Sequence, residues 1–446
     1  MHRRIYHRIY LCILLACGLL LAACSAEPTS APAVRPVTPD TVTVRMAAYN
    51  IEDVRQEDLE NPSHPRLQAV AAEVQRLRPD VILLSEVAYD QPGAPGYRDG
   101  EPAGQNALRF AERFLAVPQE PGLEPLRYAA FAAPVNTGLA SGFDLDGDGQ
   151  VVRSFPPPEP AGPGGEPGIQ TAEGRLYGND AWGFGTFPGQ YGMALLVRED
   201  LEILTDSVRT FRLLPWSRMP GAEMPVDPAT GESWYDAAER AAFRLSSKSH
   251  WDVPVRLPNG TVLHLLASHP TPPAFDGAER RNVLRNAAEI RFWRDYIDGA
   301  AYVVDDSSRA GGLPAGASFV ILGDLNADLD EGLSHQDPVG TYLLAHPRIN
   351  GTFVPQADTT TRGAYPSLSP DDTAIWGMRV DYVLPSADLR VRDGGVRRPP
   401  TGDGTAVRPS DHFMIWLDLG VPPRPSGGQA SETASETASA AAGAAK

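Results

Sequence analysis

The chain has 446 residues, and its 39 lysines and arginines against 56 aspartates and glutamates give a formal net charge of −17. This charge repels nucleic acid and anionic membranes at long range, which argues against a protein that binds through an extended basic surface. The three cysteines are Cys12, Cys17 and Cys24. The rest of the chain therefore holds no internal disulfide and no cysteine-ligated metal, and its core must be stable without covalent links.

Residues 1–23 have the features of a secretory signal. Three arginines precede the apolar run 9–21, which is short for a membrane span, and the tetrapeptide LAAC then ends at Cys24. This ending resembles the bacterial lipoprotein box, which implies a signal peptide over 1–23 and a lipid on Cys24. We expect an exported lipoprotein, periplasmic or at the cell surface, that contacts the membrane through this anchor only. An uncleaved anchor helix and an ordinary signal peptide are the alternatives.

Composition divides the remainder of the chain into three parts. Residues 24–40 are rich in Pro, Ala and Thr and are typical of a flexible tether, and 422–446 contain the low-complexity repeat SETASETAS of a disordered tail. Between them, 41–421 are predicted to form one domain that acts as a monomer. Gly- and Pro-rich or polar insertions near 134–192 and 215–234 interrupt it.

The domain alternates strand and helix patterns, which predicts an α/β fold. Asn259-Gly260 favours a type I′ turn in a hairpin. Helices are expected at 64–77, 106–114 and 276–297, and strands at 41–48, 81–84, 192–197, 253–257, 262–267, 319–322, 379–384 and 413–419.

The first insertion contains the beginning of a calcium-loop pattern. Asp144, Asp146 and Asp148 are followed by Gly149, which matches D-x-D-x-D-G. The twelfth position is Phe155 instead of Glu, so the EF-hand pattern is broken. Structural Ca²⁺ binding and a solvated turn are both compatible with these residues.

Acid, amide and imidazole side chains repeatedly follow the predicted strands. Within GDLNAD, Asp324 could activate a water and Asn326 could donate to an anionic oxygen, or both could form an Asx-turn. A lone histidine is more often a satisfied core residue, but many such coincidences point to one site. The candidates are Asn50, Glu86, His269, Asp324, Asn326, Asp381, Asp411 and His412.

The ordered motifs YNIE, LLSEV, ASHPTPP, GDLNAD, VDYVLPS and SDHF resemble the endonuclease/exonuclease/phosphatase superfamily. The match is nearest the pancreatic-type deoxyribonuclease branch, because of the histidine in ASHPTPP. The resemblance implies a four-layer sandwich of two packed β-sheets flanked by helices. It also implies a divalent-metal phosphoesterase site at one rim of the sheets.

The resemblance further implies a role for each motif residue. Glu86 would be the principal metal ligand with Asn50 and Asp411 nearby, and Glu52 would offer a second acidic contact. Asp324 would orient or deprotonate the attacking water and Asn326 would bind the phosphate. His412, held by Asp381, would contact the phosphate or transfer a proton, and His269 would protonate the leaving oxygen. Carboxylate and amide ligands suit Mg²⁺ or Mn²⁺.

We therefore expect an exported, metal-dependent phosphoesterase that hydrolyses phosphodiester bonds, with nuclease as the default activity. The alternatives are a phospholipid or sphingomyelin phosphodiesterase, a small-molecule phosphatase, or an inactive binding lipoprotein. The acidic charge, the insertions and the absence of the deoxyribonuclease cysteines leave the substrate open between nucleic acid and a small diester. Arginines 280, 281, 285, 291 and 294 either line the cleft on one helix or pair with acids on a solvated face.

Overall fold

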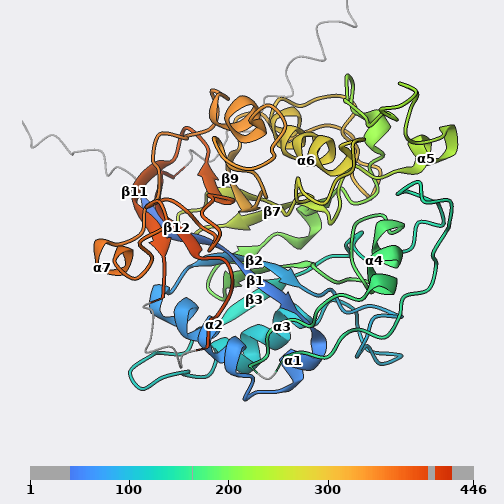
Figure 1. The fold of residues 1–446 in the computed structure, drawn as a ribbon. Helices are drawn as coiled ribbons and strands as arrows, with labels where there is room; N and C mark the ends of the chain where they lie inside the picture. The colour runs from blue at the N-terminus through green and yellow to red at the C-terminus, as the bar shows by residue number, and fades with distance from the viewer. Residues whose placement is uncertain (1–40, 163, 400–406, 424–446) are drawn as a thin grey trace, which may run out of the picture. The chain divides into compact units, whose positions relative to one another are not determined.

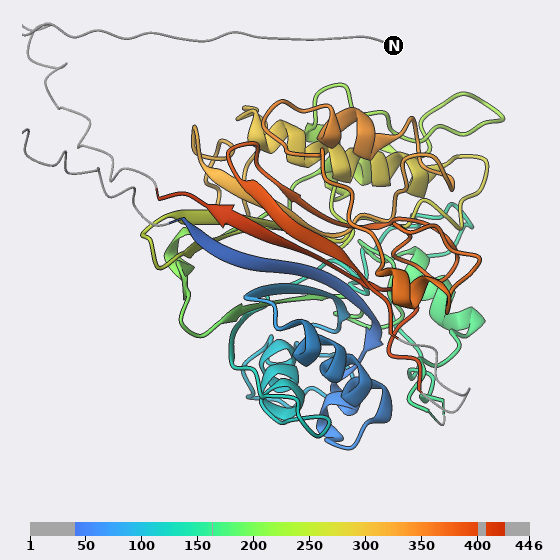
Figure 2. The same ribbon diagram turned by 90° about the vertical axis from the view of Figure 1, so that its left-hand side faces the viewer.

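Two β-sheets form the middle of the structure, and helices cover their outer faces (Figures 1 and 2). The computed structural model describes residues 41–162, 164–399 and 407–423. The predicted signal peptide with Cys24, the tether and the tail from residue 424 lie outside the described residues. Among the described helices, none combines the length and the hydrophobicity needed to cross a membrane.

The first sheet has the strand order β11-β12-β1-β2-β4-β3, and the second has β10-β9-β8-β7-β5 with β6 paired to β7. β1 is parallel to β2 and β8 is parallel to β9, whereas the other pairs are antiparallel. The strands are β1 (Val42–Val54), β2 (Val81–Val87), β3 (Tyr128–Phe131), β4 (Met193–Arg198), β5 (Glu202–Ile203), β6 (Arg209–Thr210), β7 (His250–Arg256), β8 (Val262–Ser268), β9 (Ser318–Asp324), β10 (Asp381–Pro385), β11 (Arg390–Arg397) and β12 (Met414–Val421).

The helices lie on the two outer faces of the sheets and in the connecting segments (Figure 2). The α-helices are α1 (Gln56–Glu60), α2 (Pro65–Leu77), α3 (Asn106–Phe110), α4 (Ala172–Asn179), α5 (Ala237–Ala242), α6 (Arg281–Ile297) and α7 (Thr359–Arg362). Short π- or 3₁₀-helical turns are η1 (Ala111–Leu115), η2 (Thr205–Ser207), η3 (Trp216–Arg218) and η4 (Val339–Leu344).

Alternation along the strands explains why the molecule has four layers. In β1, Met46 and Ala48 face the core between the two sheets, whereas Ala47 and Tyr49 face the core beneath α2. In β9, Val320 belongs to the core between the sheets. Its neighbours Phe319 and Ile321 pack on the opposite side, in the same core as Trp293 and Tyr296 of α6. The predicted sandwich of two packed sheets flanked by helices is confirmed.

Several predicted boundaries are wrong, for local physical reasons. The helix predicted from 276 begins at Arg281, because the Asp276 carboxylate accepts from the backbone N–H groups of Asn282 and Val283 at 2.7 and 2.8 Å. The helix predicted at 106–114 is α3 followed by the π-helical turn η1. β1 continues to Val54, so Asn50 lies within the strand and not after it.

The hairpin between β7 and β8 has a turn of another type than predicted. Gly260 has a φ of 82°, but Asn259 is not in the left-handed region that a type I′ turn requires. The N–H of Gly260 donates to the carbonyl of Leu257 at 2.9 Å, which closes a turn with Pro258 at its second position. Proline sets the φ that a type I turn needs there, so the turn follows Pro258 and not the Asn-Gly pair.

Candidate active site

Polar side chains from both sheets meet near the carboxyl ends of β2 and β9, beside the last part of β1. Asn50 lies in β1 beside Ser85 of β2, in parallel register. Its Nδ2 donates to Glu86 Oε1 at 3.1 Å and to Asp324 Oδ2 at 3.0 Å. Glu86 belongs to the first sheet and Asp324 to the second, so the Asn50 amide joins the two sheets at this point. The sequence motifs that contain these residues therefore contribute to one site.

Asp324, Asp381 and His412 form the buried centre of the site. Asp381 and Asp324 are paired across β10 and β9. His412 Nδ1 lies 2.8 Å from Asp381 Oδ2, and His412 Nε2 lies 3.7 Å from Asp324 Oδ2. Burial opposes the charge on the ring, but these two carboxylates outweigh it and raise the pKa of His412 to about 10. His412 is therefore an imidazolium at neutral pH, as expected if Asp381 holds it.

Gly323 explains how the second histidine reaches Asp324. A Cβ atom at position 323 would lie 1.9 Å from the carbonyl oxygen of Ser268, so only glycine allows β8 and β9 to approach this closely. His269, the next residue after β8, then places Nε2 at 3.4 Å from Asp324 Oδ2. Burial, Lys248 and His412 lower the pKa of His269 well below its usual value, so its ring is neutral. A neutral ring has no extra proton to give, and the role of His269 as the acid for the leaving oxygen stays a prediction.

Asn326 fits both interpretations of GDLNAD, the Asx-turn and the side-chain amide that donates at the site. Its backbone N–H donates to Asp324 Oδ1 at 2.8 Å, which is the Asx-turn alternative, and its φ is 52°. Its Nδ2 donates to the carbonyl of Pro270 at 3.1 Å, next to His269. The turn therefore fixes the Asp324 carboxylate and holds the Asn326 amide at the site, and its predicted contact with phosphate stays a prediction.

The surroundings of Glu86 fit a divalent cation. Its Oε2 accepts from the Asp53 N–H at 2.9 Å, and Glu52, Asp53 and Glu86 all have positive φ values, which is costly for these residue types. Burial and the nearby Asp411 raise the pKa of Glu86 to about 7. A cation would relieve this repulsion, and the oxygens of Glu86, Asp411 and Asn50 are the donors that Mg²⁺ or Mn²⁺ prefers. Glu52, predicted as a further acidic contact, pairs with Arg408 at 3.3 Å.

Asp324, Asp381 and His412 also place ligand atoms within 4.8 Å of one another. His412 is protonated and directs Nδ1 at Asp381. An imidazolium offers no lone pair to a metal. These three residues therefore suit proton transfer better than metal binding. Glu86 is the better candidate to ligate a divalent cation.

Lys248 is a site residue that the sequence analysis missed. It is buried beside β7, and its Nζ donates to the Pro270 carbonyl at 3.2 Å. Burial lowers its pKa, while Glu289, Glu86 and Asp324 act in the opposite direction. The chain contains only one other lysine, Lys446, among many arginines. That rarity was the available signal, because Lys248 is the one lysine within the predicted domain 41–421, where every other basic residue of this kind is an arginine.

Glu289 of α6 holds the two segments on which Lys248 and His269 lie. Its Oε1 accepts from the Ser247 N–H at 2.7 Å, and its Oε2 accepts from the Thr271 N–H at 2.7 Å. Glu289 is 1% exposed, so these bonds are shielded from water. The carboxylate thus connects the segment before β7 to the segment after β8.

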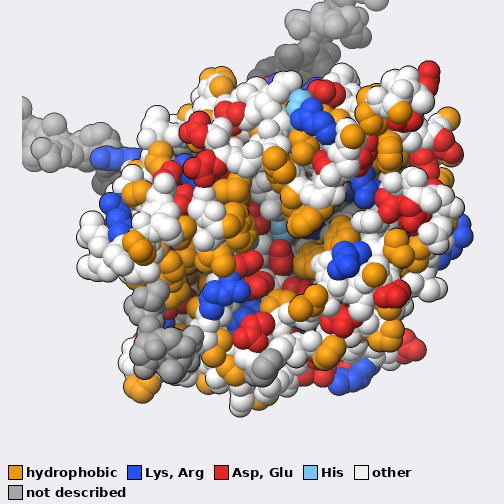
Figure 3. Space-filling model, in the orientation of Figure 1, with side chains coloured by type: hydrophobic (Ala, Val, Ile, Leu, Met, Phe, Trp, Pro, Cys, Tyr) orange, Lys and Arg blue, Asp and Glu red, His pale blue; other side chains and the backbone are white. Residues whose placement is uncertain are grey.

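A cavity of about 790 Å³ opens next to this centre and is lined on one side by Glu86, Lys248 and His269. Figure 3 shows a hollow in which acidic and histidine side chains are bordered by hydrophobic ones. Arg281 and Arg285 of α6 also line the cavity, whereas Arg291 and Arg294 pair with Asp295 at 3.2 and 2.6 Å. Arg281 also pairs with Glu279 at 3.7 Å, so both predicted environments of the basic helix occur, and Arg281 has both of them.

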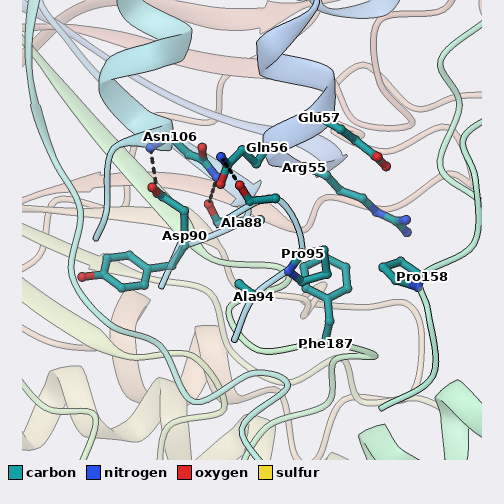
Figure 4. A pocket seen from close by; sticks show the side chains of 12 residues that line it. Arg55, Gln56, Glu57, Ala88, Asp90, Ala94, Pro95, Asn106, Pro158 and Phe187 are labelled. Atoms are coloured by element: carbon teal, nitrogen blue, oxygen red, sulfur yellow. Dashed lines mark hydrogen bonds between the residues drawn. The ribbon is translucent and has the colours of Figure 1, made fainter. Parts of the chain in front are cut away.

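A second, smaller pocket near Arg55 has about 40 Å³ and is less suited to catalysis (Figure 4). The Asp90 carboxylate on its wall accepts from the Asn106 N–H at 2.9 Å and from Arg109 Nη1 at 2.9 Å. These bonds occupy the Asp90 carboxylate, and Glu57, the other acidic residue that lines the pocket, is exposed. The pocket has room for little more than a few waters.

The calcium-loop residues Asp144, Asp146 and Asp148 place carboxylate oxygens within 4.8 Å of one another. Asp144 accepts from the Asp148 and Gly149 N–H groups at 3.1 and 2.8 Å, which is also how a turn without an ion is held. Binding of Ca²⁺ to this loop stays a prediction.

Three solved structures illustrate what the chain is similar to. An endonuclease/exonuclease/phosphatase from Beutenbergia cavernae DSM 12333 is 17% identical with a TM-score of 0.47, over 86% of this chain and 73% of that one. A mannosyl-6-phosphatase from Bacteroides thetaiotaomicron VPI-5482 is 14% identical with a TM-score of 0.41, over 84% and 99%. TDP2 from D. rerio, complexed with a single-strand DNA product, is 11% identical with a TM-score of 0.42, over 85% and 99%.

No curated protein sequence matches this chain. The model of the Endonuclease/Exonuclease/phosphatase family matches residues 49–412, which include the whole set of predicted site residues. The chain belongs to the endonuclease/exonuclease/phosphatase family.

Proposed function

We propose that this protein is a divalent-metal-dependent hydrolase of phosphodiester bonds. Members of its family hydrolyse phosphoesters. The observation that carries the proposal is the contact of Asn50 with both Glu86 and Asp324, at 3.1 and 3.0 Å, because it brings a metal-type carboxylate beside a buried base. The nuclease expected by default is one form of this activity.

Hydrolysis requires a new bond from water oxygen to phosphorus and loss of the P–O bond to the alcohol. Asp324 lies where it can accept a proton from the attacking water, and the turn at Asn326 keeps its carboxylate in place. His412 is a cation and can stabilise charge on the non-bridging oxygens. Lys248, which lies just before β7, can do the same. The leaving oxygen must gain a proton; the His412 imidazolium carries one, whereas the neutral His269 would first have to take one up.

Glu86, Asp411 and Asn50 are the residues that would hold the metal. A bound divalent cation supplies Lewis-acid stabilisation of the phosphoryl oxygens. The family uses divalent metals, which agrees with the oxygen donors present here. Mg²⁺ or Mn²⁺ is the proposed ion.

The test is a panel of phosphodiesters, phosphomonoesters, DNA and RNA, each with Mg²⁺, Mn²⁺, Ca²⁺ or EDTA. We expect diester hydrolysis with Mg²⁺ or Mn²⁺ and none with EDTA. Glu86→Gln should lower activity by roughly 10²-fold or more and weaken Mg²⁺ binding measured by calorimetry. Glu57→Gln, at an exposed position in α1, is the matched control. Full activity of Glu86→Gln with unchanged Mg²⁺ affinity would contradict the assignment.

We also propose export and lipid attachment at Cys24, supported by the arginines, the apolar run and LAAC in residues 1–24. The test is to fractionate bacterial cells that produce the wild type or Cys24→Ala, with Cys17→Ala as the control. We expect only Cys24→Ala to leave the membrane fraction. Equal partition of all three proteins would argue for a retained apolar helix instead.

A further inference from the structure

The large cavity beside Glu86 is lined on its catalytic side by Glu86, Lys248 and His269, and most of its remaining lining comes from parts of the chain outside the catalytic motifs. Its walls come from the 134–192 insertion with α4, from the segment around α5, and from the beginning of α6. Its volume of about 790 Å³ lies in the range of pockets that enclose a small organic ligand. The predicted insertion 134–192 thus shapes the space next to the reacting groups, whereas the described lining residues include none from 215–234.

Part of the cavity wall is apolar. Phe184, Leu176 and Phe275 line the cavity and remain 37%, 39% and 92% exposed, although most large apolar side chains of this protein are buried. Tyr235 and Phe243 continue this wall and are themselves buried. Exposed aromatic side chains that converge on a cavity can gain free energy by covering an apolar ligand.

The charges on the lining have the opposite sign to the charge of the whole chain. Arg175, Lys248, Arg281 and Arg285 line the cavity, and Glu86 is the one carboxylate among the lining residues that the structure describes. The chain as a whole carries −17. An anionic group is therefore favoured inside the cavity, next to a surface that otherwise repels anions.

A nucleic-acid polymer is a poorer occupant of this space. Binding a polymer requires a row of cations that follows successive phosphates. Arg285 directs its donors at the backbone carbonyls of Leu245, Trp182 and Ser246, and Arg291 is paired with Asp295. Arg281 and Arg294 are also paired, with Glu279 and Asp295, so the described part of α6 presents no row of unpaired cations that could follow successive phosphates.

We infer that the substrate is a small phosphodiester with an apolar organic group. That group would lie against Phe184, Leu176 and Phe275 while the phosphoryl group reaches Glu86, Lys248 and His269. An aryl diester and a short-chain lipid diester share this chemistry. The inference rests on the proposed phosphodiesterase activity and adds its substrate class.

The experiment compares two diesters with the same leaving group, bis(4-nitrophenyl) phosphate and methyl 4-nitrophenyl phosphate, in the presence of Mg²⁺. The ratio of their kcat/KM values, divided by the ratio of their uncatalysed rates, measures recognition of the second group. We expect this corrected ratio to be about 10 or more for the wild type, as burial of one aromatic ring allows. The double variant Phe184→Ser/Phe275→Ser should bring it close to one.

The control is Val117→Ser/Val354→Ser, which removes two apolar side chains, 49% and 42% exposed, that do not line the cavity. It should keep the corrected ratio of the wild type. Thermal unfolding of all three proteins shows that each is folded. A corrected ratio near one in the wild type, or one that the phenylalanine variant leaves unchanged, overturns the inference.

Two further substrates separate the sources of the apolar group and test the polymer alternative. Dihexanoylphosphatidylcholine below its micelle concentration represents lipid diesters, and a thymidine oligonucleotide represents nucleic acid. Turnover of either apolar diester that depends on Phe184 and Phe275 supports the inference and identifies the source. Preferred cleavage of the oligonucleotide, insensitive to these substitutions, overturns it but keeps the phosphodiesterase. Hydrolysis of none of these substrates contradicts the proposed function itself.

Discussion

His412 Nδ1 and Asp381 Oδ2 lie 2.8 Å apart. His412 stands just before β12 of the first sheet and Asp381 is the first residue of β10 in the second, so this contact joins the two sheets. Asp381 is completely buried, so its carboxylate acts on the imidazole without solvent screening. The pair therefore fixes the orientation of the ring and keeps it positively charged.

Replacing Asp381 by Asn should reduce kcat by roughly 10²- to 10⁴-fold, because the amide keeps the shape but removes the charge that holds the proton on His412. Steady-state kinetics on 4-nitrophenyl diesters measures the effect, and NMR titration of the ring should show a lower pKa for His412. Asp393→Asn, at an exposed position in β11, should change neither. An active Asp381→Asn protein with an unshifted pKa of His412 would show that the contact has no catalytic role.

Gly323→Ala should disrupt the approach of β8 to β9. The new Cβ would lie 1.9 Å from the Ser268 carbonyl oxygen, and the backbone must shift to relieve the contact. We expect a loss of about 2–4 kcal/mol in the free energy of unfolding and a much lower kcat, since His269 moves away from Asp324. Urea unfolding and kinetics measure the two effects. Gly363→Ala, where no neighbouring atom of the described residues lies within 4 Å of the added Cβ, is the control. Wild-type stability and activity of the Gly323 variant would refute this account.

Lys248→Met should lower activity without lowering stability. The ammonium group is buried and, among the described residues, has the Pro270 carbonyl as its one hydrogen-bond acceptor, so its removal relieves a desolvation cost. Loss of a cation beside the phosphoryl group should reduce kcat/KM by roughly 10- to 100-fold. Urea unfolding should show equal or higher stability. Arg390→Met removes an exposed cation from β11 and should leave activity unchanged. A less stable but fully active Lys248→Met would assign the lysine to structure alone.

His250 should make stability fall in mild acid. Burial lowers its pKa to about 4 from 6.5, against the smaller opposing effect of Glu289. Its Nε2 lies 2.9 Å from the Glu289 carbonyl and its Nδ1 contacts Ser246 Oγ, an arrangement that suits the neutral ring. The unfolded chain takes up the proton first, so this contribution is complete above about pH 6.5 and is lost as pH falls toward about 4.

The comparison that isolates His250 is urea unfolding of wild type and His250→Gln at about pH 7 and about pH 5. Gln keeps a donor for the Glu289 carbonyl but does not titrate. The wild type should lose about 2 kcal/mol more than the variant between the two pH values, because other titrating groups are common to both. Equal losses would mean that His250 remains neutral in the unfolded state or charged in the folded one.

Local patterns in the chain predicted most of the strands, but they missed some whole strands and misplaced the first residue of α6. The apolar runs that became β2, β8 and β9 were recognisable, because each of them is buried on both faces. β11 was missed, since only two of its eight residues are buried and its pairing to β12 replaces hydrophobic burial as the reason for its conformation. The beginning of α6 was missed because a side chain outside the helix, Asp276, caps it.

The sequence by itself determined the family, the α/β class and the identity of the polar residues at the strand ends, because short-range periodicity and motif order are local properties. Only the tertiary structure decided which of those residues touch. Asn50 meets Asp324 across 274 positions, and His412 meets Asp381 from the opposite sheet. Packing also decided that His412 is charged and His269 neutral, and it placed Lys248 at the site. Burial and neighbouring charge determine protonation, and both depend on contacts between distant segments.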